Sequence, residues 1–417
     1  MTGLSAEVVE QGITNQFKKP WHELKASQKR GRLLSEQFLR CYNKSPAGEV
    51  AYQRVVWRSL FMPTELFYAM NLMPFTVEMA AAQLALSNLA IGRLETAEGN
   101  GFSQDLCSFI KTGAGAVLEN IFPSPDVIIT TSHLCDPAAK FAAFTAKKYK
   151  RPEFVIDIPY GMWSLDSDQQ QLEESVDYVA GQLEEMVRFI TRNTGAELDT
   201  EELSRVIHRT NEARYWLKLG NDLAHSPKTD ILLGSKDLNY AANLMQTWGT
   251  KEIVDVYRAR FEEFKAAAQV TQDRPRKPRV LWSHLRPYYD NHLLAYIEEK
   301  ANIVYSQVNY VFWDDLDPND PFRSIARKTI LNPGYWPLKK RIELTIGRRL
   351  KGDGIIAFYP KSCRHFHSCA RMEEESSRAA GIPMLVIDGD CIDNRGDDFM
   401  VQKTRIDRFL KDLRPPE

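Results

Sequence analysis

Three of the six cysteines in this chain occupy positions where a strand or a loop leads into a helix. Cys135 follows residues 127–130, a β-branched run that is typical of a strand buried on both faces. Asp136 and Pro137 then favour the start of a helix. Helix amides stabilise a thiolate, and open α/β sheets bind ligands at the carboxyl ends of their strands. Cys135 is therefore a candidate ligand or reactive thiol, although on its own this position is more typical of a buried structural cysteine.

Cys107 and Cys363 have similar surroundings. Cys107 lies in the early turns of a helix that we expect to begin near Ser103 and to reach Asn120, where amides and the helix dipole favour an anion. Cys363 follows a predicted strand at residues 354–358. Three such thiols can converge. They would leave one iron of a [4Fe–4S] cluster open to water or substrate, whereas a closed cluster usually takes four cysteines.

The residues after Cys363 also allow a zinc site. Cys363, His365, His367 and Cys369 are four acceptable zinc ligands within seven positions. On a helix, Cys363 would face His367 and His365 would face Cys369, so the side chains would form two pairs on different faces. A purely structural role for this segment is a further interpretation.

The elements around these cysteines predict an α/β protein with parallel sheets. A strand at residues 126–131, a helix at 138–150 and a strand at 154–158 form a βαβ unit. Long helices are expected from residue 166 to about 268. The following proline-rich, basic segment, residues 273–279, is where we expect a domain boundary.

A second α/β set follows that boundary. Its predicted strands, separated by helices, lie at residues 280–283, 303–305, 354–358 and 383–387. We therefore predict three regions. These are a helical N-terminal region at 1–95 that packs on the first domain, a first α/β domain with a helical extension at 96–272, and a second α/β domain at 273–417.

Composition excludes several classes of protein. Lys and Arg (54) nearly cancel Asp and Glu (55), so no global field would attract nucleic acid or a membrane surface. The first 16 residues are mixed polar, and no apolar run approaches the roughly 18–20 residues of a membrane span. Six scattered cysteines are too few for a disulfide scaffold. We expect a cytoplasmic protein with free thiols and without nucleic-acid or membrane partners.

Three common nucleotide-binding or catalytic motifs are absent from the sequence. It contains no Gly-x-x-x-x-Gly-Lys-Ser/Thr phosphate loop, and Gly113-Ala-Gly115 lacks the strand and turn of a dinucleotide fingerprint. It also contains no Gly-x-Ser-x-Gly nucleophile elbow. We therefore expect that the chain does not hydrolyse ATP and is not a serine hydrolase of the common kind.

Taken together, the motifs of residues 55 to 413 resemble the 2-hydroxyacyl-CoA dehydratase and benzoyl-CoA reductase family. The resemblance rests on Trp57 to Pro63-Thr-Glu65-Leu and Pro74, Asp105-Leu-Cys107-Ser, Leu134-Cys135-Asp136 with Lys140, Asp353-Gly-Ile-Ile with Lys-Ser-Cys363-Arg, and Asp388-Gly-Asp390 with Asp393-x-Arg395. The last motif is closest to the benzoyl-CoA reductase branch. The family implies two flavodoxin-like (Rossmann-like) parallel-sheet domains with additional helices.

The resemblance also implies a cofactor and an activity. Cys107, Cys135 and Cys363 would hold a [4Fe–4S] cluster at the interface of the two domains. The cluster would deliver single electrons at low potential to a CoA thioester. The partners would be a related second iron–sulfur subunit, in a heterodimer or larger assembly, and a separate ATP-hydrolysing activator. The family includes both reductases and dehydratases that act on acyl-CoA substrates, and its members pair as unlike subunits, one with a cluster at the substrate and one with a relay cluster.

Cys369 and Cys391 are additional thiols near these motifs, and with Cys41 they complete the six. Some relatives hold an [8Fe–9S] double-cubane cluster with six cysteines in one subunit. The cysteine count therefore allows an alternative, a double-cubane reductase that acts on a small molecule, although Cys41 lies far before the first motif. A third interpretation is a non-enzymatic or zinc-stabilised α/β binding protein.

Six further residues are candidates for the substrate site, which we expect in the cleft between the domains. Cations beside the cysteine motifs would meet the phosphates of an acyl-CoA: Lys140, Lys361 and Arg364. Polar side chains near the cluster would orient the acyl group or deliver a proton: Glu78, Ser132 and His133.

Overall fold

The computed structural model describes residues 19–42, 54–159, 169–269, 277–331 and 352–413. Within these ranges it leaves out residues 61, 134, 225, 227, 228, 230, 232, 239, 241–243, 312 and 397. The polar N-terminus at 1–16 and most of the proline-rich segment at 273–279 fall outside the described part. None of the helices that the structure describes is long and apolar enough to span a bilayer.

The first sheet has four parallel strands in the order β2-β1-β3-β4. The strands are β1 (Arg54–Arg58), β2 (Leu72–Thr76), β3 (Val127–Thr131) and β4 (Glu153–Ile156). The prediction of a helical region at residues 1–95 is thus wrong in part, because this region supplies β1 and β2. Pro74 lies inside β2, where a proline normally argues against a strand. It is tolerated here because β2 is the edge strand of the sheet.

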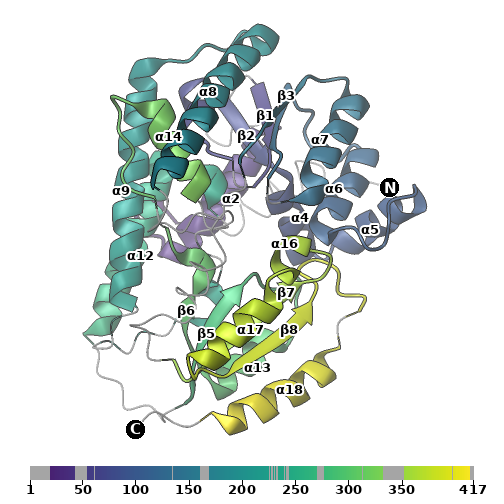
Figure 1. Ribbon diagram of the computed structural model, residues 1–417, viewed down its shortest axis with the longest axis vertical. Coiled ribbons are helices and arrows are strands. Elements are labelled where there is room, and N and C mark those ends of the chain that lie inside the picture. Colours follow the sequence, from purple (N-terminus) through teal and green to yellow (C-terminus); the bar gives the residue numbers. More distant parts are fainter. Residues whose placement is uncertain are drawn as a thin grey trace.

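Helices cover both faces of this sheet (Figure 1). Alternate residues of a strand point to opposite faces, so Val56 and Ile129 pack toward one helical layer while Trp57 and Ile128 pack toward the other. The first layer contains the long helices α8 (Gln169–Thr194), α9 (Thr200–Ala224) and α12 (Lys251–Ala268). The second contains α4 (Val77–Leu86), α5 (Ala90–Gly99), α6 (Ser108–Leu118) and α7 (Asp136–Tyr149).

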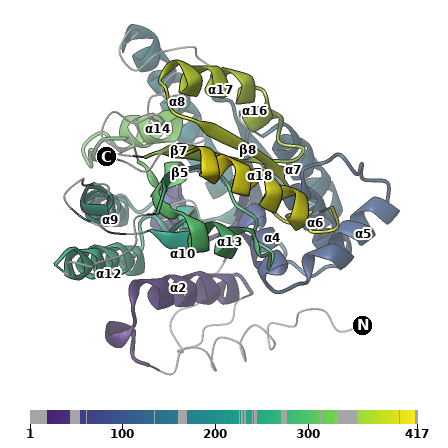
Figure 2. The same cartoon turned by 90° about the horizontal axis from the view of Figure 1, so that it is seen from below.

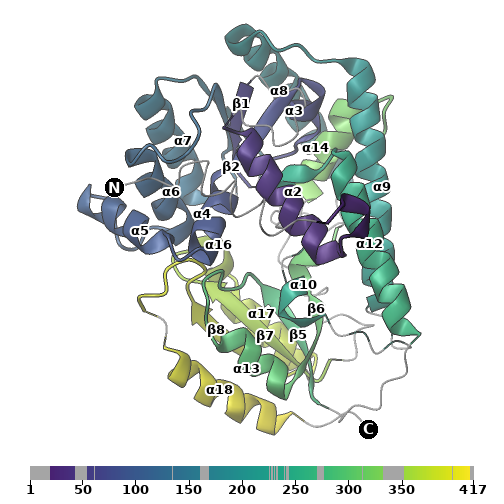
Figure 3. The ribbon, with the colours of Figure 1, turned by 180° about the vertical axis from the view of Figure 1, so that it is seen from behind.

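Shorter elements complete the first half of the chain. Helix α2 (Ala26–Arg40) lies against α12 on the side of the molecule that faces the viewer in Figure 3. The short helices are η1 (Trp21–Glu23), α3 (Glu65–Ala69), α10 (Gly234–Asp237) and η2 (Met245–Thr247).

The second sheet repeats the parallel design in the order β6-β5-β7-β8. Its strands are β5 (Arg279–His284), β6 (Asn302–Ser306), β7 (Gly354–Pro360) and β8 (Met384–Gly389). Helices α13 (Leu293–Lys300) and α18 (Phe399–Asp412) lie on one side of this sheet and α17 (Ala370–Ala379) on the other (Figure 2). Short η3 (Gln307–Asn309) follows β6. Two parallel sheets with helices on both faces confirm the predicted fold class, two flavodoxin-like domains with additional helices.

Helix α14 (Pro321–Leu331) connects the two halves of the molecule. It belongs to the predicted second domain, but it packs on α8 of the first. Arg323 Nη2 lies 3.0 Å from Glu173 Oε2, and Arg327 pairs with the same carboxylate. The predicted domain boundaries at residues 95 and 272 stay predictions. Helix α14 connects the regions on the two sides of the second boundary.

Candidate functional site

The three predicted cysteine ligands are all N-cap residues of helices. Cys107 caps α6, Cys135 caps α7, and Cys363 caps the short helix α16 (Arg364–His367). Cys135 follows the end of β3, and Cys363 follows the end of β7. The expected cap at Ser103 is wrong, because the helix begins at Ser108. Each thiol therefore lies beside helix amides, as the sequence predicted.

The three thiols come together from both halves of the molecule. Burial, followed by the charge of Cys363, raises the pKa of the Cys107 thiol to about 12. Burial, followed by the charges of Cys107, Glu78 and Cys363, raises the pKa of Cys135 well above its ordinary value. Electrostatic coupling of this kind requires that the groups lie close together. Helix α16 meets the start of α7 at this place, because Arg364 Nη1 lies 3.4 Å from Asp136 Oδ2.

Cys391, noted from the sequence as an additional thiol and counted only in the double-cubane alternative, is a fourth thiol at this place. It is 1% exposed. Its pKa is raised by burial and then by Asp390, Cys107 and Cys363. The strand order could have revealed it, because β7 and β8 are neighbours and the residues after them share one edge of the sheet.

The other two cysteines have their own surroundings. Cys41 Sγ lies 3.3 Å from the carbonyl oxygen of Gln37 in its own helix. Cys369 Sγ lies 3.1 Å from the carbonyl oxygen of Phe366. Within the described residues, the segment from Cys363 to Cys369 included, no three side chains of His, Cys, Asp or Glu gather around a single-ion position.

Glu78 is the predicted polar residue that lies at the thiols. It belongs to the first turn of α4, and its Oε1 lies 3.4 Å from the amide nitrogen of Leu60. Burial raises the pKa of its carboxyl group, while backbone amides and Arg58 oppose this shift in part. Its charge in turn affects the Cys135 thiol. A carboxyl group with a raised pKa can stay protonated closer to neutral pH and act as a proton donor.

Ser132 and His133 are arranged differently. Ser132 Oγ donates to Asp157 Oδ1 over 2.5 Å and accepts a hydrogen bond from the amide of Ile158. Both of these hydrogen bonds are with the residues that directly follow β4. His133 is 8% exposed, and burial lowers its pKa to about 4. Its imidazole is therefore neutral at pH 7, which makes it unsuitable as a cationic acid.

The three predicted cations are exposed at the same edge. Arg364 Nη1 lies 3.4 Å from Asp136 Oδ2, so the residues that follow Cys363 and Cys135 form an ion pair across the two halves. Lys140 and Lys361 have exposed side chains. The surface near the thiols thus carries exposed positive charge.

A polar network, which we call the clasp, joins α5 and α6 to the segment after β8. Ser108 Oγ, next to Cys107, donates to Asp390 Oδ1 over 2.6 Å. Arg395 binds Glu98 with two nitrogens at 2.7 and 2.9 Å, and Lys111 Nζ lies 2.7 Å from the same carboxylate. The clasp explains the predicted Asp390 and Arg395 motif, because it fixes the Cys107 helix against the second sheet.

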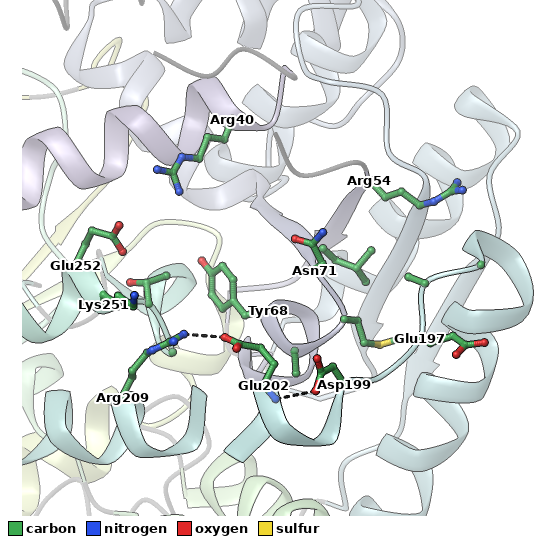
Figure 4. Close-up of a pocket in the computed structure, with 17 residues that line it drawn as sticks. Arg40, Arg54, Tyr68, Asn71, Glu197, Asp199, Glu202, Arg209, Lys251 and Glu252 are labelled. Atoms are coloured by element: carbon green, nitrogen blue, oxygen red, sulfur yellow. Dashed lines mark hydrogen bonds and ion pairs between the residues drawn. The ribbon is translucent and has the colours of Figure 1, made fainter. Parts of the chain in front are cut away.

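A cavity of about 590 Å³ lies away from the thiols, at the opposite edge of the first sheet. Its wall includes Arg54 and Leu72, the first residues of β1 and β2. Figure 4 shows Arg209 paired with Glu202 among a mixture of cations and carboxylates. Four basic and four acidic side chains line it, so its charge favours no one class of ligand: Arg40, Arg54, Arg209, Lys251, Glu197, Asp199, Glu202 and Glu252.

The fold and site together define a class of protein: two parallel α/β sheets whose carboxyl edges bring helix-capping thiols together. The chain belongs to the family described as 2-hydroxyglutaryl-CoA dehydratase, D-component, whose model matches residues 59–413.

Curated relatives are similar over most of their length. The chain is 22% identical to the (R)-phenyllactyl-CoA dehydratase alpha subunit of Clostridium sporogenes, covering 85% of this chain and 88% of the relative. It is also 22% identical to a subunit of the benzoyl-CoA reductase of Thauera aromatica, covering 89% and 91%. The (R)-2-hydroxyisocaproyl-CoA dehydratase alpha subunit of Clostridioides difficile matches at 22%, covering 91% and 94%. The family resemblance is confirmed. The chain is an enzyme subunit of the dehydratase and reductase kind, and the names of its relatives imply a multi-subunit complex.

Proposed function

We propose that this chain is an iron–sulfur subunit of an acyl-CoA reductase or 2-hydroxyacyl-CoA dehydratase. The observation that carries the proposal is the convergence of Cys107, Cys135 and Cys363, each at a helix N-terminus, from two sheets. Three half-buried thiolates that lie close together repel one another, so a cationic iron group would compensate their charge and fits this donor set. A cuboidal cluster is wider than a single ion, which agrees with thiols that do not surround a one-ion position.

These three cysteines would hold a [4Fe–4S] cluster. When bound, such a cluster supplies single electrons at low potential. Glu78 would orient the thioester or donate a proton to an oxygen of the substrate, because burial favours its protonated form. Arg364, Lys361 and Lys140 would bind CoA phosphates at the rim. His133, neutral at pH 7, would act only as a hydrogen-bonding group.

The electrons would come from outside the chain. The sequence has no phosphate loop, so a separate ATP-hydrolysing activator would supply the electrons at low potential. A related second subunit would complete the enzyme. The double-cubane alternative, with an [8Fe–9S] cluster, is less favoured, because Cys41 and Cys369 lie against carbonyl oxygens of their own segments.

Anaerobic iron and sulfide analysis tests this proposal. We expect about four irons and four sulfides per chain, with no ATP hydrolysis by the purified chain alone. About eight irons would support the double cubane. Protein purified without oxygen that contains zinc, or no metal and no broad visible absorbance, would contradict the proposal.

A further inference from the structure

A small cavity lies inside the first α/β unit, and Glu78 is one of the residues that line it. It measures about 30 Å³ and is bounded by β1, β3, α4 and α7. Most of its wall is apolar, with Trp57, Ile128 and Phe141 among the lining side chains. Five polar or charged side chains also line it: Arg58, Ser59, Glu78, Thr130 and Thr145.

Three of these polar groups are hydroxyls without a partner. Ser59 Oγ, Thr130 Oγ1 and Thr145 Oγ1 are buried and have no hydrogen bond within the described structure. Thr130 is 2% exposed and Thr145 is fully buried. Buried hydroxyls nearly always have a protein or water partner, so three that face one cavity need a common explanation.

The size and chemistry of the cavity fit water. A water molecule needs roughly 10–15 Å³ of such space and two to four polar partners. The cavity has room for one or two molecules, and three hydroxyls with one carboxyl group supply the partners. An apolar occupant would leave the three hydroxyls without hydrogen bonds.

We propose that this cavity is a water-binding site in which one or two ordered waters join Ser59, Thr130 and Thr145 to the carboxyl group of Glu78. The water holds this carboxyl group in one orientation toward the thiols, so Thr130 and Thr145 are positioning residues for Glu78. Only this consequence for catalysis rests on the proposed function. The occupancy of the cavity does not.

Replacement of threonine by valine tests the water site, because the two side chains have nearly the same shape. Thr145→Val or Thr130→Val removes a partner of the water, so each should lower the melting temperature. Thr112→Val is the matched control, since its hydroxyl is also buried without a partner but does not line the cavity. It should leave the melting temperature unchanged or raise it.

The double variant Thr130→Val/Thr145→Val adds a second criterion. Both residues would share the same water, so the double variant should lose less stability than the sum of the single variants. If both single variants keep or raise the melting temperature, as Thr112→Val does, the cavity is dry and the proposal is wrong.

Infrared difference spectroscopy tests the contact with Glu78 and needs no cofactor. The band of its protonated carboxyl group is identified by its loss in Glu78→Gln. We expect the band to move to higher wavenumber in Thr145→Val, because a carbonyl group that loses a hydrogen bond absorbs at higher frequency, and to stay in place in Thr112→Val. An unmoved band in Thr145→Val would overturn the positioning role. Because the measurement uses the purified chain, it stays informative even if the chain binds no iron.

Discussion

Burial and metal binding have opposite effects on the protonation of the helix-capping cysteines, and burial affects Glu78 in the same way as the cysteines. Burial favours neutral side chains and raises the pKa of Glu78, Cys107 and Cys135. A metal group needs thiolates, so its binding must release protons and offset the cost of burying charge. The thiols of Cys107 and Cys135 are therefore neutral at pH 7 in the metal-free chain, and burial shifts Glu78 toward its protonated form.

Glu78→Gln should separate proton chemistry from cofactor binding. The amide keeps the size of the side chain but has no acidic proton, so we expect turnover of the complete enzyme to fall by about 10²–10⁴-fold with unchanged iron content. Glu119→Gln is the control, since Glu119 pairs with Arg93 at the far end of α6. Turnover in Glu78→Gln equal to that of the control would exclude Glu78 as a proton donor.

Charge reversal at Lys361 and Arg364 should weaken acyl-CoA binding. Both side chains are exposed, so we expect a loss on the order of tenfold that shrinks as salt is added, with iron content unchanged. Anaerobic titration with an acyl-CoA measures it. Lys148→Glu, an exposed position at the other end of α7, is the control. Unaltered affinity in the double variant would remove these two residues from the site.

For individual residues, the sequence predicted position best where a residue lies at the boundary between a strand and a helix. The positions of Cys135 and Cys363 between a strand and a helix could be predicted, because β-branched residues precede them and helix-forming residues follow them. Cys391 was noted as an additional thiol but not placed with the other three, because only the adjacency of β7 and β8 brings it to them. The surroundings of Ser132 depend on Asp157, 25 residues away just after β4, which local patterns do not show.

At the scale of elements, α14 packs against the first half of the chain and is fixed there by a buried ion pair. Lys328 is buried, forms an ion pair with Glu65 of α3, and lies 4.9 Å and 5.0 Å from the ring centres of Trp248 and Trp313. Thr210 Oγ1 donates to the same carboxylate over 3.0 Å. These partners offset part of the cost of burying both charges, although burial still lowers the pKa of Lys328 below its ordinary value.

Lys328→Met should be strongly destabilising, because it leaves Glu65 buried without its cation. We expect a loss of about 3–5 kcal/mol in the free energy of unfolding. Arg323→Gln on the same helix breaks an exposed pair with Glu173 and should cost less than about 1 kcal/mol. Denaturant titration compares the two variants. Equal losses would show that burial does not distinguish these pairs.

Element types could largely be predicted, but two strands could not. The long helices α8 and α9 have the expected positions, because their apolar residues recur at helical spacing. Strand β2 contains Pro74 and β1 is only five residues long, so local patterns favoured a helical region there. The place of β1 in the sheet is set by pairing with β3, which is distant in sequence, and β2 joins the sheet by pairing with β1.

At the scale of the whole molecule, the clasp holds the two halves in register around the thiols. Arg395 first, and then Lys111, lower the pKa of Glu98 to about 2, below its ordinary value of 4.5. A carboxyl group with a lowered pKa stabilises the folded state fully above its ordinary pKa. This contribution is lost as the pH falls toward the folded value.

Glu98→Gln should therefore flatten the pH dependence of stability between about pH 4.5 and 2. Above this window the variant should be less stable than the parent, and the difference should shrink as the pH falls. Denaturant titrations at several pH values measure it. Glu95→Gln, one turn earlier in α5, is the control and should follow the parent. A constant difference across the window would show that the clasp does not depend on the charge of Glu98.

Replacement of single cysteines followed by anaerobic iron and sulfide analysis tests the central claim most directly. Cys107→Ser, Cys135→Ser and Cys363→Ser should each lose most of the iron, because each removes one of three thiolates that hold the cluster. Cys369→Ser should retain it, since Cys369 Sγ lies against the carbonyl oxygen of Phe366. A full complement of iron and sulfide in Cys135→Ser would contradict the account.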